Sequence, residues 1–384
     1  MQDINRFFIE EGEGETAPQV FFSKNEAGGD NSAGGGEPSQ SDDLFEGELD
    51  SALQVFKSGG ANTDLLKENG AQILFYVDLE NEEVIAKEQM EENKEDEDDG
   101  EREIGERPHP MLFNQYPLCE AHSLLLLFAE HSFPQVLSNE LIQLLLQIFK
   151  LSQQPTLRLG YNSMGADCII NNLHFHVMQV DKLFGESSEM ETFPIEQVDK
   201  QLFFKTSLKH RADGEIDMFN CGVRFGELVG WPLRTLLISP HIEDDNTELE
   251  DAQEALAHAA GVVLNHLIES NIPHNILVAD EGMTMYIIPR KFDMLIENVQ
   301  FFTSFESLCG FVKFKNEAAY REMDWASVSE ALATQVSMSQ PEFEFLKNTL
   351  VDKFIGEYHG ERIGPVTGEA NVAEVNVAVE NMQL

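Results

Sequence analysis

The chain has 384 residues, of which 42% are apolar, and a formal net charge of −44. A chain of this length can bury a core as two domains or as one large α+β unit with tails. Attraction to a nucleic-acid backbone requires clustered lysine and arginine, and here 25 basic residues without a cluster stand against 69 acidic ones. The longest apolar run, 124–129, is far shorter than the roughly 20 residues of a membrane-spanning helix. We therefore expect neither a nucleic acid nor a membrane as a partner.

The cysteines and the first residues bear on the compartment. The four cysteines lie far apart and form no CxxC pair. The opening residues, MQDINRFFIEEGEGE, lack the basic start and the apolar stretch of a signal peptide. We therefore expect a reduced protein in the cytoplasm.

Acidic residues are concentrated in the first part of the chain. Residues 1–106 hold 30 of the 69 acidic side chains and 7 of the 25 basic ones. The Gly- and Ser-rich stretch 25–43 is typical of a flexible linker, and the run 88–106 has eleven acids against two bases, so that it repels itself and stays solvated. The predicted organisation is a largely disordered acidic region at 1–70, a core at 71–225 with an acidic loop at 88–106, a C-terminal α+β part of the same fold at 226–358, and a disordered tail at 359–384.

Apolar runs and capping signals predict the elements of the core in chain order. Ser138 is expected to cap a helix that ends at Leu151, and a capping box of Thr247 and Glu250 is expected to open a helix that ends near Ser270. Strands are predicted at 72–79, 109–118, 122–128, 172–177, 201–210, 216–226 and 233–239.

The last part of the core is predicted to contain a hairpin and two helices. The hairpin spans 274–289 and turns at Glu281 and Gly282. The helices follow at about 326–337 and 341–357. The elements together favour an α+β fold, with an antiparallel sheet flanked by helices.

Residues 160–179, GYNSMGADCIINNLHFHVMQ, carry the pattern with the clearest chemistry. In an extended chain His174 and His176 share one face with Asn172, and the alternate residues are apolar. A neutral imidazole can attack phosphorus if an acceptor holds the proton of its other nitrogen. The turn at 161–167 can offer backbone N–H groups to a phosphate, with Gly165 allowing close approach. The same pattern also suits a structural histidine pair, or a zinc site whose third ligand is not visible nearby.

The stretch LGYNSMGADCIINNLHFH resembles the signature of the histidine-triad superfamily, and specifically the branch of GDP-D-glucose and GDP-L-galactose phosphorylases, whose pattern is close to GYNSLGAxATINHLHF. The resemblance covers about residues 72–357 and implies a histidine-triad-like α+β fold. Further segments recur in the family's order: PLCEAHSLLL with FPQ (133–135), FPIEQ (193–197), GWPLRTLLI (230–238), NIPHNILVADEG (271–282) and FESLCG (305–310).

This resemblance implies a nucleotidyltransferase that converts GDP-D-glucose or GDP-L-galactose plus inorganic phosphate to GDP and hexose 1-phosphate. His174 occupies the position of the nucleophile that carries GMP between two displacements. His176 matches a histidine that bonds a phosphate oxygen. The partners implied are the GDP-sugar and inorganic phosphate, with no cofactor and no metal, and a homodimer is left open. The predicted phosphate- and substrate-binding residues are Asn162, Ser163, Gly165 and Asn172.

The chain also departs from the family pattern. Asn172 stands where the triad has its first histidine, and an amide can hydrogen-bond but carries no proton. Ile169 replaces a hydroxyl residue, Leu127 and Phe128 replace a Pro-Arg pair, and an upstream arginine-rich segment has no counterpart. Two alternatives therefore stay open: a nucleotide hydrolase, in which water replaces phosphate, and a catalytically impaired relative that binds a nucleotide or a protein.

Several other residues have a structural interpretation or an open one. His122 is interpreted as a satisfied histidine at the start of a strand, and Cys168 and Trp231 as core residues. Three arginines can either neutralise phosphate or bridge surface acids, and the sequence does not decide between these roles: Arg158, Arg224 and Arg234.

Overall fold

The computed structural model describes residues 21–24, 73–78, 83–86, 109–114, 118, 122–129, 133–168, 172–183, 191–211, 221–242 and 247–363. The predicted linker at 25–43 and the acidic loop at 88–106 lie outside the described residues. Twelve strands form one sheet: β2 (Ile73–Asp78), β3 (Glu83–Ala86), β4 (His109–Phe113), β5 (Ser123–Leu126), β6 (Leu157–Asn162), β7 (His174–Gln179), β8 (Lys200–Arg211), β9 (Gly222–Leu228), β10 (Leu236–His241), β11 (His274–Ala279), β12 (Thr284–Pro289) and β14 (Tyr358–Arg362).

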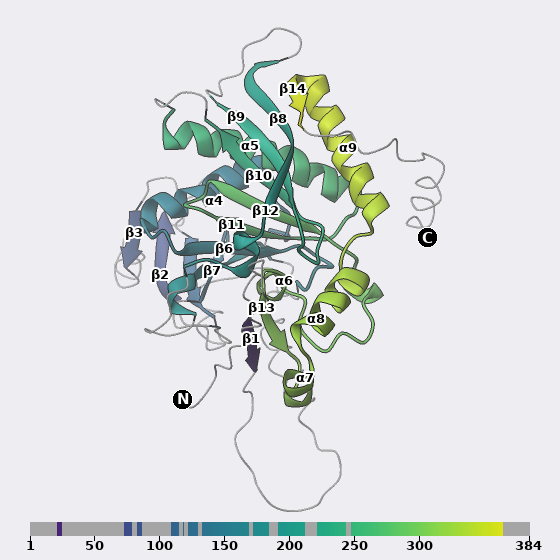
Figure 1. Cartoon of the computed structure of the whole chain (residues 1–384). Helices are drawn as coiled ribbons and strands as arrows, with labels where there is room; N and C mark the ends of the chain where they lie inside the picture. The colour runs from purple at the N-terminus through teal and green to yellow at the C-terminus, as the bar shows by residue number, and fades with distance from the viewer. Residues whose placement is uncertain are drawn as a thin grey trace, which may run out of the picture.

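Every strand pair in this sheet is antiparallel, and the order is β14-β8-β9-β10-β12-β11-β6-β7-β5-β4-β2-β3 (Figure 1). A separate parallel pair joins β1 (Phe21–Lys24) to β13 (Phe311–Phe314). Residues 359–362, which the sequence analysis assigns to a tail, belong to β14 and pair with β8. The central strands β6 and β7 lie side by side, and they carry the stretch with the two histidines.

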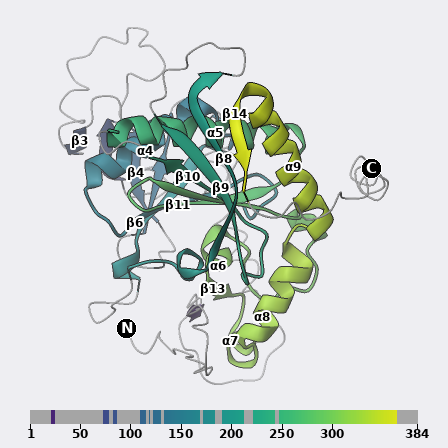
Figure 2. The ribbon, with the colours of Figure 1, turned by 45° about the horizontal axis from the view of Figure 1, so that its top comes forward.

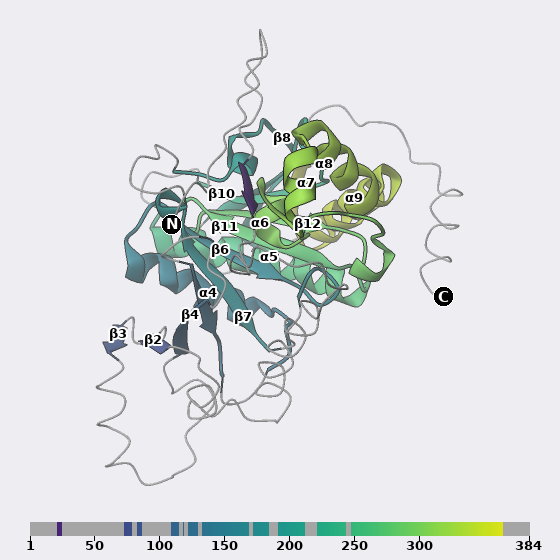
Figure 3. The ribbon, with the colours of Figure 1, turned by 90° about the horizontal axis from the view of Figure 1, so that it is seen from below.

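Helices cover both faces of the sheet. Because side chains alternate along a strand, Ile276 and Val278 of β11 enter one buried cluster and Leu277 and Ala279 enter the other. The first cluster also contains residues of α4 (Asn139–Ser152), α5 (Leu249–Glu269) and α9 (Gln340–Glu357), and α9 runs beside the β8 and β14 end of the sheet (Figure 2). The second contains residues of α6 (Phe305–Leu308), α7 (Glu317–Glu322) and α8 (Trp325–Ala331). Helices α6 and α7 contact β13, and α7 and α8 lie side by side (Figure 3). The predicted α+β class, an antiparallel sheet flanked by helices, is confirmed.

One of the two predicted helix caps is confirmed and the other is wrong. The Ser138 hydroxyl accepts a hydrogen bond from the Leu141 N–H at the start of α4, as expected of an N-cap serine. Helix α5 has Glu248 as its N-cap, without a side-chain hydrogen bond to the helix. The predicted capping box of Thr247 and Glu250 fails because the helix begins one residue later, so these two residues no longer flank the cap at the required spacing.

The hairpin of β11 and β12 is confirmed. Asp280, Glu281 and Gly282 turn the chain with positive φ angles. Of the two predicted late helices, α9 has the expected bounds, and α8 is α-helical only to Ala331 and continues as a π-helix over Leu332–Val336.

Gly160 of β6 brings α6 against the sheet beside β7. A Cβ atom at this position would lie 2.0 Å from the Phe305 ring, so only glycine leaves room for that ring. Gly160 is also the register partner of His176. The close approach of Phe305 therefore places the next residue of α6, Glu306, beside the histidine-bearing strand.

Candidate active site

His174 is held as a neutral ring with a free lone pair. Its Nδ1 atom lies 2.7 Å from the backbone carbonyl oxygen of Asn172. A carbonyl only accepts hydrogen bonds, so Nδ1 carries the proton and the lone pair is on Nε2. Burial lowers the pKa of His174, which favours this neutral form. Among the described residues Nε2 has no hydrogen-bonding partner, so its lone pair is available to a ligand.

Gln135 fixes the position of His174 on β7. The Gln135 Oε1 atom accepts the His174 N–H at 2.9 Å, and its Nε2 atom donates to the His174 carbonyl at 3.0 Å and to the Asn162 carbonyl at 3.1 Å. The Tyr161 hydroxyl donates to the Gln135 backbone carbonyl at 2.7 Å. One side-chain amide thus joins the end of β6 to the start of β7. The sequence showed only that FPQ recurs in the family.

His176 lies on the same face and belongs to a buried polar cluster. The His122 Nε2 atom is 2.9 Å from His176 Nδ1, and Glu306 Oε1 is 3.9 Å from the same nitrogen. The ring of His176 contacts that of Phe305, with centroids 5.3 Å apart. Burial lowers the pKa of His176 well below its usual range and that of His122 to about 4, so both rings are neutral. His122 is buried at the start of β5, as expected, but it contacts the predicted site.

Glu306 and Lys313 supply the charges of this cluster. Lys313 Nζ lies 3.4 Å from Glu306 Oε1, and the carboxylate is almost fully buried. Burial is the largest single influence and raises the pKa of Glu306. The Lys313 charge, the charges that His176 and His122 carry once protonated at low pH, and a hydrogen bond from the Ser304 hydroxyl together bring that pKa to about 2. Apart from Ser304, the second oxygen, Oε2, is buried without a partner among the described residues. The sequence analysis identified neither residue as part of the site.

Three of these side chains have ligand atoms close enough for a metal ion. The available atoms of His122, His176 and Glu306 all lie within 4.8 Å of one another. This group shares only His176 with the histidine pair of the sequence pattern, and its other two members come from distant parts of the chain.

The predicted phosphate-binding turn is held by internal hydrogen bonds. Asn162 Oδ1 accepts from the Phe305 N–H at 2.9 Å, and Ser163 Oγ accepts from the His274 N–H at 2.8 Å. Gly165 has a φ angle of +79°, and a Cβ there would lie 2.7 Å from Phe292. These bonds fix the turn next to α6, while its contact with phosphate stays a prediction.

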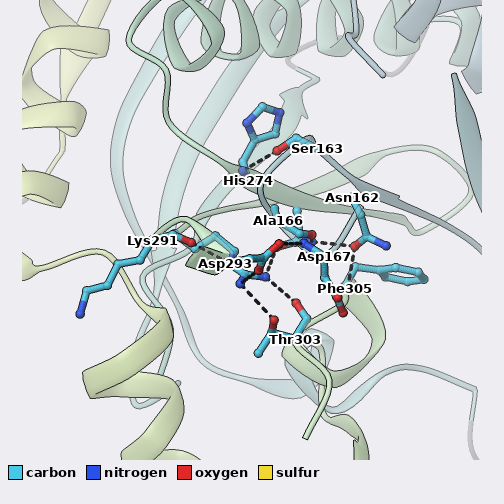
Figure 4. A network of polar contacts seen from close by, with 11 residues as sticks. Asn162, Ser163, Ala166, Asp167, His274, Lys291, Asp293, Thr303 and Phe305 are labelled. Atoms are coloured by element: carbon cyan, nitrogen blue, oxygen red, sulfur yellow. Dashed lines mark hydrogen bonds and ion pairs between the residues drawn. The ribbon is translucent and has the colours of Figure 1, made fainter. Parts of the chain in front are cut away.

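Arg290 anchors this turn through a network of hydrogen bonds. Its five N–H groups donate to the Lys291 carbonyl, the Thr303 carbonyl and hydroxyl, Asn275 Oδ1 and the Asp293 carboxylate. Figure 4 shows Asp293 and Thr303 converging beside Asn162, whereas the ring of His274 points away from this network.

Asp167 extends the Arg290 network into the turn. The other oxygen of Asp293 accepts the backbone N–H of Asp167 at 2.5 Å. Burial raises the pKa of the Asp167 carboxyl to about 6. The turn therefore contains an ionisable group that titrates close to neutral pH, which the sequence analysis did not identify.

Of the other residues singled out in the sequence, Asn172 lies at the site, and the described ones among the rest lie elsewhere. Asn172 is buried, and both of its side-chain amide atoms lack a partner among the described residues. Arg158 is buried and pairs with Glu196 at 2.9 Å, which is a structural role. Trp231 lies in the second cluster, as predicted. No hydrogen bond or ion pair joins Arg224 or Arg234 to the histidines within the described part of the chain. Ile169 lies outside it.

The site thus combines a neutral histidine that has a free lone pair, on an antiparallel sheet, with a neighbouring glycine turn, an arrangement suited to nucleophilic catalysis. Two family models match the chain: GDPGP1-like, N-terminal domain, at residues 63–178, and GDPGP1-like, C-terminal domain, at residues 207–355. Together they cover more than half of the chain, and it belongs to this family.

Individual relatives give the same indication at modest identity. The chain is 26% identical to GDP-L-galactose phosphorylase 2 of Arabidopsis thaliana over 275 residues, which are 69% of this chain and 56% of that protein. It is 38% identical to GDP-D-glucose phosphorylase 1 of Danio rerio over 71 residues, or 18% of this chain and 21% of that protein. The chain thus spans little more than half the length of the plant relative.

Among solved structures, the chain is similar to a yeast Ap4A phosphorylase, with a TM-score of 0.42 and 13% identity over 60% of this chain and 74% of that one. None of the described helices is long and apolar enough to span a membrane.

Proposed function

We propose that this protein is a GDP-hexose phosphorylase, which converts GDP-D-glucose or GDP-L-galactose plus inorganic phosphate to GDP and hexose 1-phosphate. Membership of the GDPGP1-like family and the names of its relatives support this substrate class. The observation that carries the proposal is the 2.7 Å contact from His174 Nδ1 to the Asn172 carbonyl, because it leaves the Nε2 lone pair for the substrate.

The reaction proceeds in two displacements at one nitrogen. His174 Nε2 attacks the phosphorus attached to guanosine, the bond from this phosphorus to the bridging oxygen breaks, and hexose 1-phosphate leaves with the electron pair. An oxygen of inorganic phosphate then attacks the GMP-histidine, the P–N bond breaks, and GDP leaves while the lone pair returns to Nε2. The first product leaves before phosphate reacts, so the kinetics are ping-pong.

The neighbouring groups are suited to hold the phosphate oxygens. His176 donates a hydrogen bond from Nε2, which has no partner among the described residues. Asn172 offers an unpaired buried amide, and burying such a group without a ligand is costly. Lys313 contributes a positive charge that the predicted arginines do not bring to the histidines. The turn at Asn162, Ser163 and Gly165 is the further phosphate contact that the family pattern implies.

Turnover tests the proposal directly. Purified protein is supplied with GDP-glucose or GDP-galactose, with and without inorganic phosphate, and GDP release is measured. We expect release only with phosphate, and a loss of about 10⁴-fold or more for His174→Asn. The matched control is His274→Asn, because His274 is also buried and its Nδ1 also lies against a carbonyl two residues earlier, at 3.0 Å.

A covalent intermediate separates this function from its alternatives. Protein incubated with a GDP-sugar labelled in the guanosine-linked phosphate should retain acid-labile GMP, and the His174→Asn variant should not. Turnover that continues without phosphate would indicate a hydrolase, in which water resolves the intermediate. Binding of GDP-sugar in calorimetry without any turnover would indicate a nucleotide-binding relative and would contradict the proposal.

We further propose that the protein is located in the cytoplasm, and we leave open whether it forms a homodimer. Fluorescence microscopy of the tagged full chain addresses the first, and light scattering during size-exclusion chromatography measures the mass in solution against the 43.2 kDa of one chain.

A further inference from the structure

His122 lies behind His176, where a ligand on the Nε2 side of His176 does not reach it. We propose that His122 is a positioning residue, which donates a hydrogen bond to His176 Nδ1 and thereby makes His176 Nε2 a hydrogen-bond donor to the phosphate oxygens. This inference rests on the proposed function for its final step, the contact with phosphate. The chain of hydrogen bonds that leads to it is a property of the folded protein alone.

The first link is the backbone N–H of Leu118. It lies 3.2 Å from His122 Nδ1, and a backbone N–H can only donate. His122 Nδ1 must therefore present its lone pair, and the neutral ring carries its proton on Nε2. The side-chain amide of Asn114 lies 3.0 Å from the same Nε2, so it turns its oxygen toward that proton and shares it with His176 Nδ1.

The second link is the contact between the two rings. His122 Nε2 is 2.9 Å from His176 Nδ1, which is a hydrogen-bonding distance. Because His122 donates, His176 Nδ1 accepts, and the neutral His176 carries its proton on Nε2. His174 and His176 thus share one strand face as opposite tautomers, one with a lone pair on Nε2 and the other with a proton on it.

Opposite tautomers are what the proposed chemistry needs. The lone pair of His174 attacks phosphorus, and negative charge then grows on the phosphate oxygens. A fixed N–H donor beside the nucleophile stabilises that charge without having to reorient during the reaction. With the other tautomer, His176 would point a second lone pair at the phosphate and repel it.

Glu306 favours a proton on His176 Nδ1, in competition with the hydrogen bond from His122. Lys313 weakens this influence by pairing with the carboxylate. The carboxylate oxygen Oε1 is 3.9 Å from His176 Nδ1, too far for a hydrogen bond, and 3.4 Å from Lys313 Nζ. A buried carboxylate without a cation would favour a proton on His176 Nδ1, because that proton would face the negative charge. The ion pair with Lys313 therefore lets the hydrogen bond from His122 decide the tautomer.

The alternative use of these side chains is a divalent metal site. His122, His176 and Glu306 have the right atom types within 4.8 Å. A metal at this point would need the lone pair of His122 Nε2, but the Leu118 N–H places the proton there. It would also lie close to the Lys313 ammonium, which repels a cation. The hydrogen-bond chain satisfies these groups better, and metal binding is one outcome of the test.

Two amide substitutions separate the two bonds of His122. In His122→Asn the side-chain oxygen takes the place of Nδ1 and can keep the bond from Leu118, while the donor to His176 is lost. In His122→Gln the side-chain nitrogen takes the place of Nε2 and can keep the donor to His176. We expect kcat/KM to fall roughly 10- to 100-fold in His122→Asn, as for other groups that orient an active-site ligand. His122→Gln should restore most of this loss.

A control and a direct observation complete the test. His109→Asn alters another buried histidine, whose Nδ1 accepts the Phe128 N–H at 3.3 Å, and it should leave kcat/KM unchanged. Imidazole ¹⁵N correlations in the unmutated protein should show His176 as the Nε2–H tautomer, and in His122→Asn a mixture with the Nδ1–H form. This measurement needs no turnover, so it stands even if the proposed function fails.

Three outcomes would overturn the inference. His176 could be found as the Nδ1–H tautomer in the unmutated protein. The Gln variant could be as impaired as the Asn variant, which would mean that the donor to His176 does not matter. Zinc could co-purify in a one-to-one ratio, with a loss of activity on chelation that zinc restores, and in that case His122 would be a metal ligand.

Discussion

Two buried polar networks lie next to α6, and they differ in how completely their groups are paired. Around Arg290 all five guanidinium N–H groups have acceptors, and Asp293 joins them to the glycine turn. Beside the two histidines, both side-chain amide atoms of Asn172 and the second oxygen of Glu306 are buried without a geometric hydrogen bond among the described residues. Buried polar groups are normally paired, so each unpaired one requires an explanation.

The difference indicates which network holds the fold and which one is reserved for a ligand. A network that is complete by itself stabilises the turn and leaves nothing to recognise a substrate. A network with buried polar atoms left unpaired, such as the amide of Asn172, loses stability in the free protein, and a ligand that pairs those atoms can offset that loss. The predictions below compare matched residues from the two networks.

Removing the cation of the complete network should have the largest effect on stability. Arg290→Met leaves the acceptors of Thr303, Asn275 and Asp293 without their donor in a buried place. We expect the free energy of unfolding to fall by about 3–5 kcal/mol, measured by urea unfolding. The control is Arg321→Met, whose exposed pair with Glu317 should contribute less than about 1 kcal/mol. A small loss at Arg290 would show that the network is not structural.

Removing Lys313, the cation of the incomplete network, should lower the free energy of unfolding by less, and the loss should depend on pH. In the unmutated protein the pKa of Glu306 is about 2, below its usual 4.5, so its ionised form stabilises the fold above pH 4.5 and this contribution is lost as the pH falls toward 2. In Lys313→Met the largest influence that opposes burial is removed, so the pKa of Glu306 rises. The charged carboxylate then destabilises the fold near neutral pH. On acidification this destabilisation decreases, because either Glu306 or the facing His176 and His122 become protonated.

We therefore expect Lys313→Met to cost about 2 kcal/mol at pH 7, less than the Arg290 change because the ammonium is partly exposed. The cost should be smaller at pH 4. Urea unfolding at both pH values measures this, with Lys315→Met as the control, since Lys315 lies just after the strand that carries Lys313 and is exposed. A cost that grows on acidification would contradict the assigned charge state of Glu306.

Short sequence patterns correctly predicted the features that depend only on residues close together in the chain. The serine cap of α4, the hairpin at Glu281 and Gly282, and the strand face of the two histidines follow from spacing alone. Strand β6, LRLGYN, was not predicted because an arginine and a glycine interrupt its apolar pattern, although all six of its residues are buried. The α5 capping box failed because the sequence does not reveal a shift of one residue in the helix start.

The candidate site was predicted as far as one segment could show it. His174 and His176 stand in a single stretch, and their motif identified them. The residues that set their tautomers come from elsewhere: His122 is 54 residues from His176 and reaches it because β5 pairs with β7. Glu306 reaches it because Gly160 admits the Phe305 ring. A glycine inside a strand is the one local signal of such an approach, and it does not say which residue approaches.

The smallest expected effect is on the free energy of unfolding when an asparagine of each network is replaced by leucine, and we expect opposite signs in the two networks. Asn172 keeps both amide atoms unpaired, whereas Asn275 donates to Asn162 Oδ1 at 2.6 Å and to the Ala166 carbonyl at 2.9 Å. Asn172→Leu removes a buried polar group with no partner and retains the backbone carbonyl that holds His174. It should raise the free energy of unfolding by about 1 kcal/mol, and Asn275→Leu should lower it.

Steady-state kinetics on the same variants complete this comparison. If the Asn172 amide is reserved for the substrate, Asn172→Leu should raise the KM for GDP-sugar while the protein becomes more stable, because the group that weakens the free protein is then one that binds the ligand. A variant that loses stability instead would mean that the amide is paired in the native protein. Asn172 would then belong with the groups around Arg290, and the phosphate-binding face of His174 would need another donor.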